Sequence, residues 1–123
     1  MSPSNLEKLP VSVLVDQFAA LCEAQDSAEL RGEYRQLKSQ FREMVAIEDE
    51  LRARPGDQRR ALMLLLDHRN MQVRLNAALA ILAVCPTEAR VALRRIEDSR
   101  HFPQAAEAGM TLKALDAGTY APR

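Results

Sequence analysis

The residues best suited to chemistry gather at one predicted turn between two helices. Five polar residues lie within eight positions there, and a sixth opens a later helix: Asp67, His68, Asn70, Gln72, Arg74 and Gln104. A histidine beside a carboxylate is suited to act as an oriented general base, and an arginine is suited to hold an anion. No nucleophile, second acid or glycine-rich phosphate loop accompanies them. We therefore expect a binding turn or a purely structural one, with no catalytic residues.

Metal and cofactor sites are not expected from this sequence. The two histidines, His68 and His101, stand far apart and have no cysteine or carboxylate at ligand spacing. Cys22 and Cys85 sit among apolar neighbours without a CxxC spacing, which favours small buried hydrophobic residues over ligands or redox groups. We predict no metal and no cofactor.

Charged residues are unevenly distributed, although the formal net charge is zero. Residues 1–51 hold ten acids and five bases, whereas residues 52–100 hold five acids and ten bases. Complementary surfaces used in self-association or partner docking would show this asymmetry, and so would two outward faces that merely differ in charge. Nucleic-acid binding is disfavoured because the chain has no net positive charge and only 4% aromatic residues.

Three runs of like charge are interpreted as solvated helix faces. They are Arg59–Arg60, Arg94–Arg95 and Glu48–Asp49–Glu50. Adjacent residues on a helix point about 100° apart, so neither arginine of a doublet supports the other at one ligand. For the same reason, the acidic run does not resemble a catalytic carboxylate pair.

Apolar periodicity predicts an all-α fold of about six helices, because β-branched residues never form alternating runs. The first helix is expected to begin between Asn5 and Ser12 and to end near Gln25, with Asp26 starting the next one. The remaining helices are predicted at about 26–54, 58–66, 71–84, 87–98 and 103–117. Leu30, Tyr34 and Phe41 belong to the predicted buried stripe of the second helix. Thr87 is expected to cap the fifth helix.

The length of 123 residues predicts a single domain over residues 1–123. No run approaches the roughly 18 apolar residues of a membrane span, so no membrane segment is expected. Residues 1–10 lack the basic start and apolar block of an export signal, and we expect a cytoplasmic protein.

Residues 65–86 resemble a HEAT repeat. The resemblance rests on an Asp in the turn between helices, Val73–Arg74 at the start of the second helix, and Ala77–Ala78 followed by Leu82 within it. It implies a right-handed superhelix of stacked helix pairs. It also implies structural roles for Asp67 and Arg74, with the carboxylate bonding free amides at a helix start and the guanidinium bonding the same carboxylate or the turn. A second unit over residues 91–115 lacks the arginine, because Phe102–Pro103 stands in its place.

A narrower resemblance covers most of the chain. Its segments are residues 50–57, 72–78, 103–110 and 115–118, which are similar to those of a small bacterial family of HEAT-like single-domain proteins whose function is uncharacterised. The likeness implies a fold and no activity. Ala106 and Glu107 depart from the Gly and Asp expected in the third segment.

The expected function is a non-enzymatic protein-interaction module that binds another protein, or a second copy of itself as a homodimer, because short helical repeats stack into binding platforms. A toxin-neutralising partner protein is the first alternative. A HEAT-like nucleic-acid enzyme is a disfavoured second alternative, and an enzyme acting on a small molecule at the Asp67–His68 turn is another.

Overall fold

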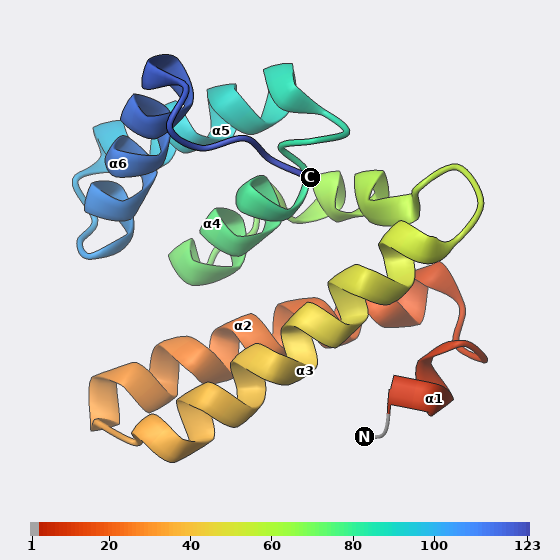
Figure 1. Cartoon of the computed structure of the whole chain (residues 1–123). Coiled ribbons are helices and arrows are strands. Elements are labelled where there is room, and N and C mark those ends of the chain that lie inside the picture. The colour runs from red at the N-terminus through yellow and green to blue at the C-terminus, as the bar shows by residue number, and fades with distance from the viewer. Residues whose placement is uncertain (1–2) are drawn as a thin grey trace. The chain divides into compact units, whose positions relative to one another are not determined.

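The computed structural model describes residues 3–123 and contains only helices in that range (Figure 1). There are six α-helices and one 3₁₀ helix among the described residues, and no strand. The all-α prediction with about six helices is confirmed. The chain forms two compact units, Met1–Ala61 (unit 1) and Leu62–Arg123 (unit 2). The right-handed HEAT-like superhelix and the single domain over residues 1–123 stay predictions.

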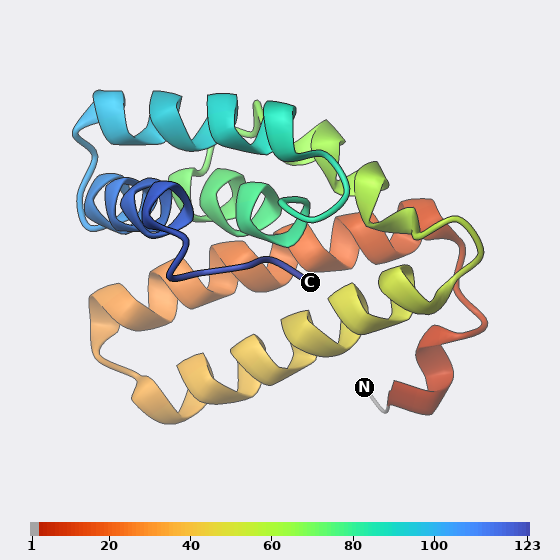
Figure 2. The same cartoon turned by 45° about the horizontal axis from the view of Figure 1, so that its top comes forward.

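Unit 1 is built on a hairpin of two long helices, α2 (Val11–Arg31) and α3 (Tyr34–Ala53). Figures 1 and 2 show them antiparallel and side by side. The turn between them is set by Gly32, whose φ of 71° lies in the left-handed region that favours glycine. The N–H groups of Gly32 and Glu33 donate to the carbonyls of Glu29 (3.1 Å) and Ala28 (2.9 Å), which ends α2.

The predicted helix boundary at Gln25 and Asp26 is wrong, because α2 continues for about five residues beyond it. Asp26 has the chemistry of a cap, but no residue near it reverses the chain as Gly32 does. The predicted burial of three residues is also wrong, since the exposed fractions are 83% for Leu30, 67% for Tyr34 and 52% for Phe41.

The core of unit 1 consists mainly of large side chains. From α2 come Leu14, Val15, Phe18 and Cys22, and from α3 come Met44, Ile47 and Leu51. On α3 these core positions lie about 100° around the helix from Tyr34 and Phe41, since successive residues are ~100° apart. The hairpin therefore leaves an apolar side of α3 outside its own core.

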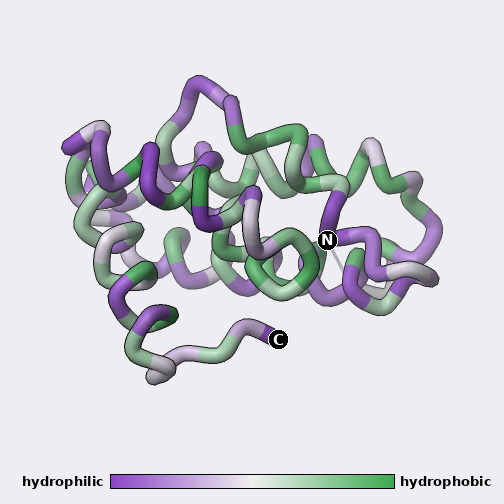
Figure 3. The backbone as a smooth tube through the Cα atoms, turned by 90° about the horizontal axis from the view of Figure 1, so that it is seen from above, coloured by the Kyte–Doolittle hydropathy of each residue, from purple (hydrophilic) through white to green (hydrophobic). Residues whose placement is uncertain are grey.

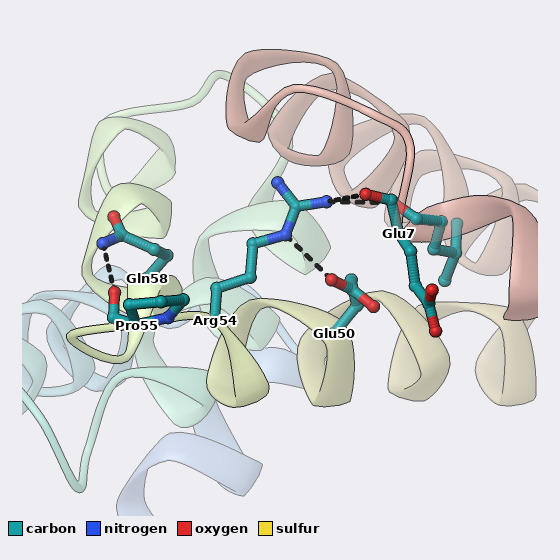
Figure 4. A network of polar contacts seen from close by, with 6 residues as sticks. Glu7, Glu50, Arg54, Pro55 and Gln58 are labelled. Carbon is teal, nitrogen blue, oxygen red and sulfur yellow. Dashed lines mark hydrogen bonds and ion pairs between the residues drawn. The ribbon is translucent and has the colours of Figure 1, made fainter.

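A short first helix, α1 (Pro3–Leu6), packs against the end of α3. Arg54 follows α3, and its guanidinium donates from Nη2 to the Leu6 carbonyl (2.9 Å) and from Nε to Glu50 Oε2 (2.8 Å), as Figure 4 shows. Leu6 is 3% exposed. One arginine thus fixes α1 to the hairpin.

Unit 2 contains α4 (Met71–Ala80), α5 (Pro86–Ser99) and α6 (Gln104–Ala117), preceded by the 3₁₀ helix η1 (Gln58–Leu65) that crosses the unit boundary. The helix predicted at 58–66 therefore exists as a 3₁₀ helix, whose period of three places Leu62 and Leu65 on one buried side.

Two proline or glycine signals bound the helices of unit 2. Pro86 occupies the first turn of α5, where its fixed φ and missing N–H are tolerated, so Thr87 lies inside the helix and the prediction of Thr87 as the cap is wrong. Gly118 ends α6 in the left-handed region with a φ of 73°, as the sequence predicts.

Small side chains fill much of the core of unit 2. Its buried alanines are Ala77, Ala78, Ala80, Ala89, Ala92, Ala105 and Ala108. They allow α4, α5 and α6 to approach closely, while Leu75, Ile81, Leu93 and Ile96 fill the remaining space. Figure 3 shows hydrophobic and hydrophilic residues interspersed along the helices.

Both cysteines are buried, as the sequence predicts. The Cys22 thiol lies 3.7 Å from the sulfur of Met44. Among residues 3–123, no helix combines the length and apolar character that crossing a membrane requires.

Candidate functional site

The turn between η1 and α4 is organised by Asn70, one of the six predicted site residues. Its Oδ1 accepts hydrogen bonds from the backbone N–H groups of Gln72 (2.9 Å) and Val73 (3.2 Å), which caps α4. Its own N–H donates to His68 Nδ1 at 3.0 Å. His68 Nδ1 is therefore the acceptor of a hydrogen bond within the turn.

The predicted structural pairing of Asp67 with Arg74 is wrong. The Asp67 side chain is 92% exposed, and its carboxylate lies 3.9 Å from the guanidinium of Arg95. Arg74 Nε is buried without a hydrogen-bond partner among the described residues. Asn70, three residues closer to the helix, takes the capping role because its short side chain reaches the first free amides directly.

Two predicted residues from distant parts of unit 2 meet in a buried amide ladder. Gln104, at the start of α6, donates from Nε2 to Gln72 Oε1 (2.9 Å), and Gln72 donates in turn to Asn76 Oδ1 (3.0 Å). Gln104 is 2% exposed and Asn76 is 9% exposed. Gln104 Oε1 is buried with no hydrogen-bond partner among the described residues. The ladder ties α4 to α6.

Asn76 was missed by sequence reasoning. The available signal was an asparagine four residues after Gln72 in a helix whose other interior positions are apolar, since residues i and i+4 share a helix face. Neutral amides neither accept protons nor attack substrates at ordinary pH. The ladder therefore supports packing. The six predicted residues separate into the Asn70 cap with its His68 contact, the ladder residues Gln72 and Gln104, the exposed Asp67, and Arg74 with its buried Nε.

A groove of about 460 Å³ lies on another side of unit 2, between the end of α5 and the exposed side of α6. Its floor consists of small residues, Ala105, Ala106 and Gly109. Phe102 and Met110 line it, and their exposed fractions are 65% and 66%. Large apolar side chains that stand open around a small-residue floor are typical of a docking surface.

Three charged residues line the same groove: Glu97, Arg100 and Lys113. The Glu97 carboxylate rests directly on Gly109, because a Cβ added there would meet Glu97 Oε2 at 2.5 Å. Glycine at 109 thus makes room for a carboxylate in the groove. Arg100 ends α5 with a φ of 57°, a left-handed conformation that is uncommon for a residue with a side chain.

A second hollow of about 350 Å³ lies on the other side of Met110. Leu79, Thr111 and Ala114 line it together with Tyr120 from the segment after α6. Because Met110 lines both hollows, we define the α6 docking face as Phe102, Ala106, Gly109, Met110, Lys113 and Tyr120. Of the six residues predicted as a site, only Gln104 belongs to α6, and it is buried beneath this face.

Unit 1 contains a partly buried charge cluster that the sequence analysis placed in solvent. Arg59 is 5% exposed and forms a two-pronged ion pair with Asp57, at 2.9 Å from Nε to Oδ1 and 2.7 Å from Nη2 to Oδ2. These hydrogen bonds lower the pKa of the Asp57 carboxyl and raise the pKa of Arg59. The interpretation of Arg59 as solvated is therefore wrong, although Arg60 is exposed.

The acidic run at the end of α3 divides in a similar way. Burial raises the pKa of Glu48, an effect that outweighs the opposing positive charge of Arg59. Glu50 forms the ion pair with Arg54, and Asp49 is exposed. Only one of the three predicted solvated acids thus stands fully in water. Among the described residues, no group of three or more His, Cys, Asp or Glu side chains is arranged to hold a metal ion.

Comparison with known proteins gives a family and a fold. The sequence model of DUF2019, a domain of unknown function, matches residues 12–116. The crystal structure of the protein RPA1889 from Rhodopseudomonas palustris CGA009 is similar, with a TM-score of 0.94 and 46% sequence identity over 96% of this chain and 98% of that one. No curated protein matches the sequence.

Proposed function

Because the chain belongs to the DUF2019 family, whose function is unknown, we propose its role from its own surface: it is a non-enzymatic protein-interaction module that binds a partner protein on the α6 docking face. The observation that supports this most directly is the exposure of Phe102 and Met110 around a groove floored by alanine and glycine.

Exposed apolar groups of this kind gain free energy when a partner covers them. Methionine and aromatic residues are enriched where proteins meet, and the energetically important contacts usually lie in well-packed hollows near the centre of the interface. Here Met110 lines both hollows, whose volumes are about 350 Å³ and 460 Å³. Ala106, the exposed small residue of the groove, permits close approach of a partner helix.

The charged residues at the groove would orient a bound partner. Arg100 and Lys113 both line it, while Glu97 occupies the space above Gly109. Charged residues around an apolar centre steer association and exclude mismatched partners more than they add affinity. The partner is another protein or a second copy of the chain.

Site-specific photo-crosslinking in the native cell tests the proposal. A photoreactive phenylalanine analogue replaces Met110, and a matched control replaces Val91, a 51% exposed residue of α5 that lines neither hollow. We expect one dominant adduct from position 110 and none from position 91. When the chain carries a purification tag, its untagged partner should no longer co-purify with the double variant F102S/M110S, but it should still co-purify with V91S.

Sedimentation of the purified chain separates the two kinds of partner. A concentration-dependent dimer that F102S/M110S abolishes identifies a second copy, and a monomer with a foreign adduct identifies another protein. A toxin-neutralising role is the alternative form of the proposal, and it predicts an adduct with a toxin encoded beside this gene. Equal adducts from positions 110 and 91, or none from 110, would contradict the docking face.

A further inference from the structure

A separate pocket of about 330 Å³ opens in unit 1 between α2 and α3. Ala20 and Leu21 line it from α2, Ala46 and Ile47 line it from α3, and Leu6 closes it from α1. All five side chains are apolar. Ligand pockets in proteins begin at roughly this size, and a dry apolar cavity of about 150 Å³ already admits benzene. The pocket is therefore large enough for one ring with a short side chain.

The hollow exists because two alanines contribute to its walls from neighbouring helices. Ala20 and Ala46 end at Cβ, whereas a leucine at either position would extend three further carbons into the space. The surrounding hairpin is otherwise packed with large residues such as Phe18 and Leu51, both fully buried. The gap is thus local, and its apolar surface would be removed from water by a ligand of matching size.

Two polar residues complete the lining, Gln17 on α2 and Glu43 on α3. Glu43 is the one charged residue of the seven that line the pocket. A carboxylate has two oxygens and about four acceptor positions, so it can accept a further donor in addition to any partner it already has. Its negative charge favours an ammonium group and disfavours a ligand carboxylate.

The α1 side of the pocket is held in place by Arg54. The arginine donates to the Leu6 carbonyl at 2.9 Å and is anchored by Glu50 at 2.8 Å (Figure 4). The Arg54 and Glu50 side chains are only 18% and 17% exposed. Arg54 is therefore a positioning residue: it does not line the pocket, but it fixes the backbone of the residue that closes it.

From these contacts we propose that the α2–α3 pocket binds a compact amine, with an aromatic or aliphatic body against Ala20, Ala46 and Ile47 and its ammonium group paired with Glu43. This site is independent of the α6 docking face, because all seven lining residues belong to unit 1.

Three probes of nearly equal size test the chemistry on the full chain: phenethylamine, 2-phenylethanol and phenylacetate. Titrations followed by two-dimensional ¹H–¹⁵N NMR give affinities and locate the shifted amides. We expect phenethylamine to bind about 1.5- to 5-fold more tightly than the alcohol, the range of one partly exposed ion pair, and phenylacetate to bind weakest. The largest shifts should fall at residues 20–21 and 46–47.

Variants separate the apolar and polar contributions. A46L, which fills the pocket with a good helix former, should weaken all three probes by at least about tenfold. A20L, on the other helix, serves the same purpose if A46L folds poorly. E43Q should make the amine and the alcohol bind equally, and R54Q should weaken all probes by a similar factor without changing their order. A117L, at the exposed end of α6 in unit 2, is the matched control and should leave the affinities of all three probes unchanged.

Absence of saturable binding by any probe, phenylacetate binding as tightly as phenethylamine, or affinities unchanged in both A46L and A20L would each overturn the proposal. Failure of these titrations would leave the α6 docking face intact, because neither Phe102 nor Met110 takes part. Conversely, the absence of a crosslink at position 110 would contradict the docking face but not the proposal that the α2–α3 pocket binds an amine.

Discussion

The cores of the two units differ in the size of the side chains that fill them. Unit 1 buries large residues such as Phe18, Leu14 and Leu51 in a two-helix hairpin, and it leaves an apolar pocket beside Ala20 and Ala46. Unit 2 brings three shorter helices together through buried alanines. Unit 1 thus fills its core with large side chains between two helices, and unit 2 uses many small ones between three, while both units leave large apolar residues exposed.

The two units also differ in the polar interactions that hold their helices. Unit 1 holds its helix ends with ionic contacts of low exposure, Arg54 with Glu50 and Arg59 with Asp57. Unit 2 uses neutral groups, the Asn70 cap and the Gln72–Asn76–Gln104 ladder, and its ion pairs such as Arg90–Asp116 are surface pairs (3.0 Å). Stability should therefore depend on pH mainly through unit 1.

The largest expected effect tests this dependence on ionic contacts. D57N removes the two-pronged carboxylate from the buried Arg59 guanidinium and should cost about 2 to 3 kcal/mol of unfolding free energy, because a buried charge that loses its main ion-pair partner is poorly compensated. Asparagine tolerates the positive φ of 52° at this position, so backbone strain is not the cause. Urea unfolding at pH 7 measures the loss.

The same variant has a pH signature with a defined sign. The folded pKa of Asp57 is lowered, so its contribution is present above the unfolded value of 3.8 and is lost as the pH falls through the folded pKa. The difference between D57N and wild type should shrink over that acidic window. R60A, which removes an exposed arginine, is the control and should change stability little. A deficit in D57N that persists unchanged at pH 2 would contradict this account.

The difference in packing predicts opposite responses to one substitution. A108L forces three carbons into the closed core of unit 2, where Ala108 is fully buried, and should cost about 1 to 3 kcal/mol. A46L places the same atoms in the open pocket of unit 1 and should be neutral or slightly stabilising. Thermal melts of the two variants compare them directly. Equal losses would show that the pocket has no more free space than the alanine core.

The neutral cap of unit 2 should have a smaller effect. N70A removes the acceptor for the Gln72 and Val73 amides and should cost about 1 kcal/mol. D67A, which removes an exposed carboxylate three residues earlier, should cost less than about 0.5 kcal/mol, the usual scale of a surface substitution. Chemical denaturation of both variants is the measurement, and a reversed order would restore Asp67 as the cap.

The weakest effect concerns Glu48. Its folded pKa is raised by burial, so ionisation opposes folding, and wild-type stability falls as the pH rises from the unfolded value of 4.5 through the folded pKa. E48Q removes the carboxylate, so the unfavourable ionisation of a buried Glu48 no longer opposes folding. The variant should match wild type below about pH 4 and exceed it at pH 7. A gain that is the same at both pH values would point to a cause other than titration.

The sequence alone determined the class of fold and most of the helix ends, because these depend on local chemistry. Apolar periodicity marked the helices, and Gly118 ended α6 at the predicted position. The burial of both cysteines also followed from their neighbours. Gly32 is also a glycine that ends a helix, α2. The capping chemistry of Asp26 predicts a helix start six residues earlier, and this boundary is wrong.

Only the tertiary structure decided which side chains meet. The resemblance to a HEAT repeat implied Asp67 and Arg74 as partners, whereas the fold pairs Gln104 with Gln72 across 32 positions and buries Arg59 against Asp57. It also left Phe102 and Met110 outside the core and opened the pocket between Ala20 and Ala46. The physical reason is that periodicity indicates how apolar a helix side is, while the length and spacing of neighbouring helices determine whether anything covers it.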